Sequence, residues 1–462
     1  MKFCTVTLGC KVNQYETGAM EGILRSRGHE PVTAGSGCDV CIINTCAVTE
    51  ESVRKSRQTI RRLKKLHPDA GIVVCGCFSQ LDPAAVEELG VDLLSGTTDR
   101  RGFVMSVMEL MKLTDKTGDS KLTCCTQTDP ITQGDGGLVM ADAFEELPPG
   151  ETANRTRALL KIQDGCDNFC TYCIVPHIRG RSRSLPLSRM AEYAKQLDEQ
   201  GYKEIVITGI EISSYGKDLH LTSPAVQLPT FNFQFSTFNS LSTAIQTISF
   251  AAPNTRLRLG SLDPAILTDE FCRQLGEIPN LCNHFHISLQ SGCDGTLKRM
   301  GRKYTTHQVQ QAINSIRNQF KDCGITADLI TGFPGETDVE FEQTINFIKE
   351  AAFSDMHIFP YSPRPGTKAS ILPDQIDKKI RKERAKKALE TSEKMSDDFK
   401  RSQIGKTVEV LFEQEKGGFS TGHTGNYLMV SVRKGLLKIK RNTIKPVKIT
   451  NIKNDILHGE IM

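Results

Sequence analysis

The sequence predicts a three-part α/β protein: an open parallel sheet, then an α/β barrel that is partial or complete, then a small β-barrel. Strand-like and helix-like segments alternate over the first hundred residues, and a second alternating run begins after a polar interruption. After Gly405 only short strand-like segments follow. Alternating strands and helices indicate a parallel sheet covered by helices, whereas strands alone over about 60 residues are typical of a small barrel.

The first part, residues 1–112, contains four strand-like runs, which are KFCTVTLG, CDVCIINTC, GIVVCGC and VDLLSG. Helices are expected at 13–27, 49–66 and 82–89. The last of these begins with Asp-Pro, a favoured helix start. Residues 113–151 are expected to form an acidic linker, because residues 112–151 hold 3 Lys against 8 Asp and Glu and are rich in turn-forming residues.

The central part, residues 152–400, has six expected strands, which are ALLKIQDG, EIVITGIEI, TRLRLGSL, HFHISLQSG, ITADLITGFPG and MHIFPYSP. Helices are expected at 186–200, 307–320 and 337–352, and a charged helix at 374–402. Repeated βα units of this kind build α/β barrels. Residues 219–255 contain no Asp, Glu, Lys or Arg, and we interpret them as an irregular segment of unknown role.

The last part, residues 401–462, has four strand-like runs, which are KTVEVLFEQ, NYLMVSVRK, LLKIKRN and IKPVKITNI. It holds 11 Lys and Arg against 5 Asp and Glu, a net charge of +6. Such a surface can attract a polyanion, although a solvated basic surface explains the charge equally well.

No apolar run approaches the roughly 20 residues that a membrane helix needs, and the N-terminus lacks the basic start and apolar stretch of a signal peptide. We therefore expect a cytoplasmic protein with no membrane partner. The chain has 16 cysteines. Because thiols are kept reduced in that compartment, clustered cysteines there favour metal binding or redox chemistry over disulfides.

The segment GCDNFCTYC at 165–173 places Cys166, Cys170 and Cys173 on one loop after a strand. Thiolates are soft ligands that suit zinc or iron–sulfur clusters. Three cysteines on a four-iron cluster leave one iron open to bind a small molecule. The alternative is zinc, with His177 as a fourth ligand, but structural zinc ligands usually come as two pairs and no second pair lies nearby.

Three further cysteines, Cys10, Cys46 and Cys77, each follow one of the first three expected strands. In an open parallel sheet, ligand sites gather at the carboxyl ends of the strands, so these thiols are candidates for a second cluster. Burial as ordinary core cysteines explains their positions equally well.

The CxxxCxxC spacing, with Tyr172 before the last cysteine, resembles the radical S-adenosylmethionine (SAM) superfamily. The resemblance implies that the open iron chelates the methionine part of SAM and that electron transfer yields a 5′-deoxyadenosyl radical. Longer segments resemble the methylthiotransferase family, which joins an N-terminal cluster domain, a radical SAM domain and a C-terminal RNA-binding TRAM domain. These segments are TLGCKVNQYET, NTCAVT, GCFSQ, KIQDGCDNFCTYCIVPHIRGRSRS, SLQSGCDGTLKRMGRKYT, DLITGFPGET, YSPRPGT and GHTGNYLMV.

This resemblance implies two four-iron clusters, the second on Cys10, Cys46 and Cys77, and SAM as a cofactor. TLGCKVNQYE is most similar to the members that modify N6-threonylcarbamoyladenosine at position 37 of tRNA (t6A37). By analogy, one SAM would methylate a sulfur atom at the second cluster, and a radical from another would remove hydrogen from C2 of adenine 37. The alternatives are isopentenyladenosine-37 tRNA, ribosomal protein S12, and a non-catalytic iron–sulfur protein that binds RNA.

No catalytic side chain is predicted beyond the cluster ligands. The predicted SAM contacts are Tyr172, Gly209, Arg258, Ser288 and Gln290, although support of the loop structure explains the last three equally well. The predicted phosphate contacts with the anticodon loop are Arg433, Lys434, Lys438, Lys440 and Arg441. A second basic set on the helix at 49–66, equally well explained as a solvated face, comprises Arg54, Lys55, Arg57, Arg61, Arg62, Lys64 and Lys65. The chemistry also requires an electron donor such as a flavodoxin or ferredoxin.

Overall fold

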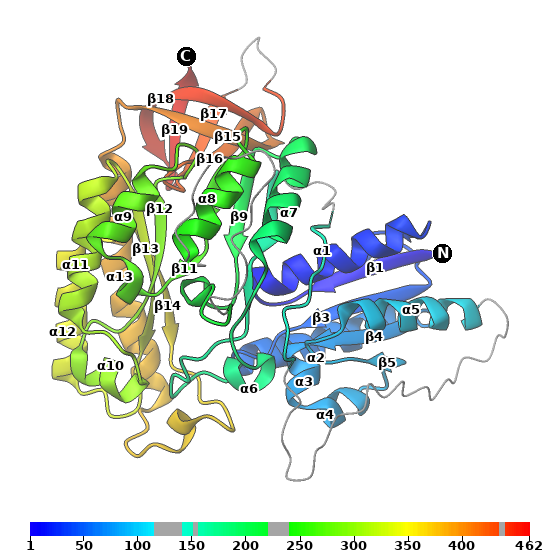
Figure 1. Ribbon diagram of the computed structural model, residues 1–462. Helices are drawn as coiled ribbons and strands as arrows, with labels where there is room; N and C mark the ends of the chain where they lie inside the picture. The colour runs from blue at the N-terminus through cyan, green and yellow to red at the C-terminus, as the bar shows by residue number, and fades with distance from the viewer. Residues whose placement is uncertain (115–140, 151–155, 220–239, 434–438) are drawn as a thin grey trace. The chain divides into compact units, whose positions relative to one another are not determined.

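The computed structural model describes residues 1–114, 141–150, 156–219, 240–433 and 439–462 (Figure 1). The chain divides into two compact units. Unit 1 comprises Met1–Ala153, Leu159–Leu185 and Ser362–Thr367, and unit 2 comprises Asn154–Ala158, Pro186–Tyr361 and Lys368–Met462. The four-part division predicted from the sequence, with boundaries after 112, 151 and 400, stays a prediction.

Unit 1 contains a five-stranded parallel sheet in the order β2-β1-β3-β4-β5. Its strands are β1 (Lys2–Thr7), β2 (Glu30–Pro31), β3 (Val40–Thr45), β4 (Gly71–Gly76) and β5 (Leu93–Leu94). Five helices accompany it, namely α1 (Lys11–Ser26), α2 (Glu50–Leu66), α3 (Cys77–Leu81), α4 (Pro83–Glu87) and α5 (Arg100–Thr114). β3 is fully buried, and its first four residues, Val40–Ile43, are apolar on both faces of the sheet.

The two faces of this sheet pack against different helices. Phe3, Ile42 and Val73 point to one face, where they contact side chains of α1 and α5. Cys4, Cys41, Ile43 and Val74 point to the other, where α2, α3 and α4 cover them. This alternation follows from the two-residue period of a strand. α2 begins where Thr49 and Ser52 form a capping box, which satisfies two backbone N–H groups of the first turn.

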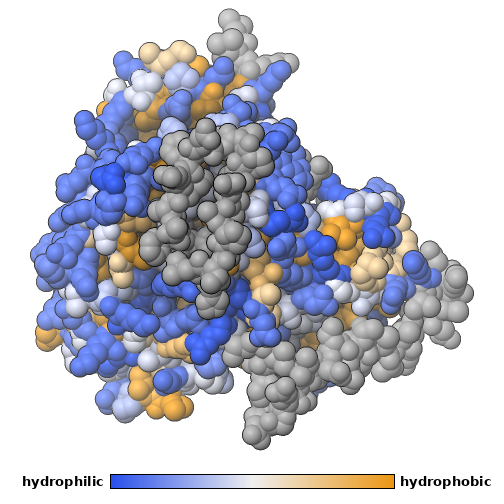
Figure 2. All heavy atoms as spheres, viewed as in Figure 1, coloured by the Kyte–Doolittle hydropathy of each residue, from blue (hydrophilic) through white to orange (hydrophobic). Residues whose placement is uncertain are grey.

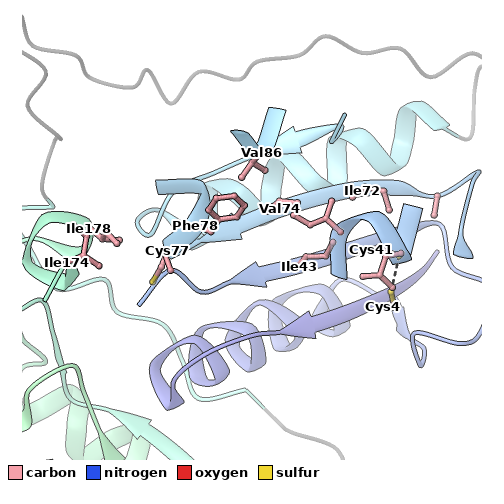
Figure 3. Packing of buried hydrophobic residues seen from close by; sticks show 14 residues of the cluster. Cys4, Cys41, Ile43, Ile72, Val74, Cys77, Phe78, Val86, Ile174 and Ile178 are labelled. Carbon is pink, nitrogen blue, oxygen red and sulfur yellow. Dashed lines mark hydrogen bonds between the residues drawn. The ribbon is translucent and has the colours of Figure 1, made fainter. Parts of the chain in front are cut away.

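The second segment of unit 1 is a long loop with little regular structure. It contains the short antiparallel pair β7 (Gln163–Asp164) and β8 (Arg183–Ser184), and helix α6 (Val175–Arg179). Ile174 and Ile178 pack with Phe78 in the core that α2 and α3 cover (Figure 3). The loop is therefore held against the first hundred residues by apolar contacts.

Unit 2 is mainly an arc of parallel strands whose spatial order follows the chain, β9-β10 and then β11-β12-β13-β14; of β6, which neighbours β9, only Arg157 and Ala158 belong to this unit. The strands are β6 (Arg157–Lys161), β9 (Glu204–Thr208), β10 (Arg256–Leu259), β11 (Ser261–Leu262), β12 (His284–Gln290), β13 (Gly324–Thr331) and β14 (Asp355–Pro360). The helices are α7 (Leu187–Glu199), α8 (Leu241–Ala251), α9 (Asp269–Gly276), α10 (Asp294–Met300), α11 (Thr306–Gln319), α12 (Asp338–Ala351) and α13 (Lys378–Arg401). Three short 3-10 turns lie at Ile212–Ser214, Pro264–Ile266 and Lys368–Ile371. Hydrophilic residues cover the outer helices (Figure 2).

The interpretation of 219–255 as irregular was wrong for its second half. Residues 241–251 form helix α8, which Ser240 caps by accepting a hydrogen bond from the Thr243 N–H. Most residues of α8 are buried, including several Ser and Thr. A helix enclosed on most sides needs no charged face, so the missing charges do not argue against a helix. Residues 220–239 lie outside the described residues.

The C-terminal part is a closed five-stranded barrel in the order β15-β16-β17-β19-β18. Its strands are β15 (Thr407–Lys416), β16 (Phe419–Thr424), β17 (Met429–Arg433), β18 (Thr443–Lys453) and β19 (Ile456–Ile461). Its core includes Val410, Phe412, Val430, Val447 and Leu457. The fold class predicted from the sequence is thereby confirmed, with the central barrel partial. In the described parts of the chain, no helix is both long and apolar enough to cross a membrane.

Candidate metal centres

The structure brings Cys10, Cys46 and Cys77 to the same edge of the unit 1 sheet. Cys46 and Cys77 directly follow β3 and β4, and Cys10 lies three residues beyond the end of β1. The strands end at one level, since Thr7, Asn44 and Cys75 are register partners. A Cβ atom on Gly9, whose φ is +99°, would lie 2.8 Å from Cys46 Sγ, so glycine is needed for this close approach.

The three thiols influence one another electrostatically. Burial raises the pKa of Cys77 to about 12, and the neighbouring Cys10 and Cys46 act in the same direction. Burial also raises the pKa of Cys10, although its own surface is exposed, while Arg179 opposes both shifts. Cys10 and Cys77 therefore keep their protons at pH 7 without a metal, and metal binding must release these protons.

A buried ionic network underlies this edge. The Arg179 guanidinium donates to Glu16 Oε1 at 2.8 Å, to Asp164 Oδ1 at 3.1 Å and to Asn13 Oδ1 at 2.7 Å. Glu16 also accepts from Arg100 Nη2 at 3.1 Å and from Lys161 Nζ at 3.2 Å. Burial alone would raise the pKa of Glu16, but the three cations hold it well below its usual range. The network fixes α1 and α6 to each other.

Cys166, Cys170 and Cys173 lie on the loop between β7 and α6. The Cys166 N–H donates to Gly180 O and the Cys173 N–H to Cys170 O, both at 3.0 Å. The first bond joins the start of the loop to the residue after α6, and the second closes a turn between two of the cysteines. Phe169 has a φ of +47°, which is uncommon for an aromatic residue and marks a tightly constrained turn. Cys170 is buried, whereas the other two are half-buried.

The two cysteine trios can be compared with the ligand sets of a single zinc ion and of a four-iron cluster. Among the described residues, neither cysteine trio, with or without His177, forms a group whose ligand atoms all lie within 4.8 Å of one another. One zinc ion draws its ligands about 3.8 Å apart, given Zn–S bonds near 2.3 Å and tetrahedral angles. In a four-iron cluster, each thiolate binds a different iron. Both donor sets consist of three free cysteines, and thiolates are the usual ligands of such clusters.

The remaining predicted SAM contacts lie in different surroundings. Tyr172 is on the cysteine loop, Gly209 directly follows β9, and Ser288 and Gln290 are buried on β12. Gln290 has a φ of +65° beside a register shift in β12, a strained conformation of the kind found at binding sites.

Arg258 is used in packing within unit 2. Its guanidinium donates to both carboxylate oxygens of Glu204, at 2.8 and 3.0 Å, and to the backbone oxygens of Thr424 and Gly425. It also lies over the ring of Tyr427. These contacts match the supporting role weighed for this residue, and its contact with SAM stays a prediction.

Sequence reasoning missed a polar group on the central strands. His286, Asp328 and His357 lie on β12, β13 and β14, and their ligand atoms lie within 4.8 Å of one another. Burial opposes ionisation of Asp328, but hydrogen bonds with both histidines hold its pKa well below the usual range. The signal was present in the sequence, because each residue is a polar interruption of an apolar strand.

The basic residues predicted to bind RNA are partly placed. Arg433, Lys440 and Arg441 are exposed, whereas Lys434 and Lys438 lie outside the described residues. On α2, part of the second basic set serves other contacts: Arg54 pairs with Glu51, and Lys64 Nζ donates to Leu89 O at 2.9 Å. The C-terminal set is therefore the stronger candidate.

Comparison with known proteins gives two family matches. Residues 160–348 match the family described as Radical SAM superfamily, and residues 2–96 match Uncharacterized protein family UPF0004. A solved structure of the radical S-adenosylmethionine methyltransferase TsrM from Kitasatospora setae has a TM-score of 0.53 at 15% identity and covers 80% of this chain and 77% of its own. At that identity it shows similarity of fold alone.

Curated relatives cover nearly the whole chain. The threonylcarbamoyladenosine tRNA methylthiotransferase MtaB of Bacillus subtilis is 36% identical over 92% of this chain and 88% of its own length. The protein of the same name from Chlamydia pneumoniae is 32% identical over 100% and 98%. The tRNA-2-methylthio-N(6)-dimethylallyladenosine synthase of Acetivibrio thermocellus is 31% identical over 96% and 89%.

Proposed function

Because the chain belongs to the radical SAM methylthiotransferase family, we propose that it adds a methylthio group to C2 of t6A37 in tRNA. The observation that carries the substrate is the similarity, over nearly the full length of both chains, to a relative named for threonylcarbamoyladenosine tRNA. The motif TLGCKVNQYE, which contains Cys10, agrees with this choice.

In this proposal Cys166, Cys170 and Cys173 hold one four-iron cluster, and Cys10, Cys46 and Cys77 hold a second. When bound, the first cluster with SAM supplies the radical, and the second supplies the site of sulfur delivery. Both donor sets belong to unit 1, which supports their working in one reaction. An aromatic C–H offers no acidic proton for a side-chain base, and general acid–base catalysis, worth roughly 10²–10⁴-fold, does not suffice for it.

The residues of unit 1 position the two sets. Arg179 ends the helix that follows Cys173 and reaches Asn13 on α1, three residues after Cys10. The hydroxyl of Thr97 donates to Ile178 O at 3.0 Å, which adds a second tie between α6 and the first hundred residues. These buried contacts hold the cysteine loop in a fixed place relative to the sheet edge.

The C-terminal barrel is the proposed tRNA contact. Arg433, Lys434, Lys438, Lys440 and Arg441 would bind phosphates, and an unstacked adenine in the anticodon loop would expose its C2 atom. The proposal places the enzyme in the cytoplasm, where tRNA and a reduced flavodoxin or ferredoxin are available.

A second candidate substrate is isopentenyladenosine-37 tRNA, because relatives named for dimethylallyladenosine are 31–32% identical to this chain. Nucleoside mass spectrometry of tRNA from a deletion strain separates the two. Loss of 2-methylthio-t6A, with restoration by the wild-type gene, is the expected result. Loss of 2-methylthio-isopentenyladenosine instead would support the second candidate.

Turnover itself has a separate test. Anaerobic protein loaded with iron and sulfide, then given dithionite and SAM, should form 5′-deoxyadenosine. The Cys170→Ala variant is expected to form none. A loaded wild-type protein that makes no 5′-deoxyadenosine would indicate a binding protein without catalysis.

A further inference from the structure

Four potential metal ligands gather at one end of the unit 1 sheet. The opposite end, the cluster edge, carries Cys10, Cys46 and Cys77. They are Cys4, Cys38, Cys41 and His67, and all four ligand atoms lie within 4.8 Å of one another. Figure 3 shows Cys4 and Cys41 together at one end of the sheet, with Cys77 at the opposite end. Neither cysteine trio of the proposed reaction includes any of these residues.

Different elements bring these ligands together. Cys4 on β1 and Cys41 on β3 are register partners that point to the face covered by α2. His67 is the C-cap of α2, and Cys38 lies in the turn before β3. The sulfur atoms of Cys4 and Cys41 are 3.1 Å apart, and those of Cys38 and Cys41 are 3.4 Å apart. Cys4, Cys41 and His67 are buried.

One ring nitrogen of His67 has a backbone hydrogen-bond partner. Its Nε2 lies 2.8 Å from Ala34 O, a backbone acceptor, so Nε2 carries the proton. The lone pair of the neutral ring is then on Nδ1. Histidine ligands of metals characteristically donate their other N–H in this way, which fixes both the tautomer and the ring orientation.

We propose that Cys4, Cys38, Cys41 and His67 bind one structural zinc ion. Three thiolates and one imidazole are a common ligand set for structural zinc, and tetrahedral ligands at Zn–S distances near 2.3 Å lie about 3.8 Å apart. The sulfur pairs need to separate by only a few tenths of an ångström to reach that spacing. Four protein ligands close the coordination shell, which indicates a structural role and not a catalytic one.

Two other uses of these thiols fit less well. The sulfurs are too close together to bind different irons of a four-iron cluster, and the group is not a second site for the proposed sulfur transfer. Thr45, at the cluster end of β3, is four residue steps from Cys41, which is about 13 Å at 3.3 Å per residue. A disulfide, with its S–S bond near 2.05 Å, would use two of the three cysteines and leave His67 without a function in the group.

The metal would stabilise the turn before β3. This turn contains Gly35, Ser36 and Gly37, all exposed, between Ala34 and Cys38, which pack against the core. A zinc ion would connect this turn to β1, β3 and the end of α2. We therefore expect zinc removal to loosen this turn without releasing iron from the cluster edge.

Metal analysis of the full-length protein, purified anaerobically and loaded with iron and sulfide, tests the proposal. The expected result is about one zinc ion per chain in addition to iron. Cys38→Ser and His67→Gln are expected to lose the zinc and keep the iron. Cys293→Ser is the matched control, because its thiol donates to Gln343 Oε1 and serine can keep that bond. Zinc that is absent, or that persists in both variants, would overturn the proposal.

A second measurement uses the unmodified chain and so does not depend on the variants folding. Cysteine alkylation is followed by peptide mass spectrometry before and after zinc removal by a chelator. Protection of Cys4, Cys38 and Cys41 that the chelator abolishes is expected. A disulfide within this group in anaerobic protein, or alkylation unaffected by the chelator, would count against zinc.

Discussion

Replacing the buried carboxylate of Glu16 by an amide, Glu16→Gln, tests the role of the network beneath the cluster edge. Arg100, Lys161 and Arg179 carry three positive charges, and Glu16 and Asp164 carry two negative charges. The substitution leaves three positive charges and one negative charge in a site from which water is excluded. Removing one partner of a buried ion pair costs about 3–5 kcal/mol. A domain has a free energy of unfolding of only about 5–15 kcal/mol, so this loss is large.

Urea unfolding followed by circular dichroism, together with hydrogen exchange of α1 and α6, measures the effect. We expect a lower free energy of unfolding, with increased exchange concentrated in those two helices. The control is Glu51→Gln, which removes an exposed pair with Arg54 on α2 and should leave stability unchanged. A Glu16→Gln protein within about 0.5 kcal/mol of wild type, the range of ordinary surface substitutions, would refute the reasoning.

The same network gives a pH dependence with a defined sign. The pKa of Glu16 is lower in the folded protein than in the unfolded chain. Its contribution is therefore full above the unfolded value of about 4.3 and is lost as the pH falls through the folded value. The difference between wild type and Glu16→Gln should narrow below about pH 4.

Further predictions concern the second cluster, RNA binding and a buried carboxylate. Cys46→Ala should lower the iron content from about eight to about four atoms per chain while 5′-deoxyadenosine formation persists; unchanged iron would contradict the second cluster. The double variant Arg433→Ser and Arg441→Ser should weaken tRNA binding. The slope of the logarithm of the binding constant against the logarithm of the salt concentration should fall by about one for each phosphate that the variant no longer neutralises. The control, Lys382→Ser at an exposed residue, should change neither the affinity nor the slope. Burial raises the pKa of Glu211 to about 7 in the folded protein. The free energy of unfolding therefore falls as the pH rises from about 4.3 to about 7, because the unfolded chain loses this proton first. Glu211→Gln should therefore melt higher than wild type at pH 8 and similarly at pH 4, and equal melting temperatures at both would show that the carboxyl is not shifted.

The alternation of strands and helices was enough to predict the open sheet, the arc of parallel strands and the terminal barrel. It also placed Cys10, Cys46 and Cys77 after successive strands, and parallel strands bring such positions to one edge. Helix α8 was missed because its buried Ser, Thr and Ile residues lack a charged face. Strands β16 and β19 were missed, and the prediction of a strand at LLKIKRN was wrong for its described residues, 439–442.

Contacts between distant residues were not visible in the sequence. Glu16 and Arg179 are 163 residues apart, and nothing in either segment identifies the other as its partner. The same holds for Cys4 and Cys41, which become neighbours only through the register of β1 and β3. Local pattern predicts elements, whereas such pairs depend on how the elements pack.

The most direct test of the proposed activity is a reconstituted reaction on defined tRNA. Anaerobic protein with both clusters loaded is incubated with SAM, a reductant, a sulfur source and tRNA carrying either t6A37 or isopentenyladenosine-37. The account predicts that t6A37 tRNA alone gains a methylthio group in place of one hydrogen, and that Cys170→Ala abolishes this product. Methylthiolation of the isopentenyladenosine tRNA instead, or 5′-deoxyadenosine formation with neither tRNA modified, would contradict it.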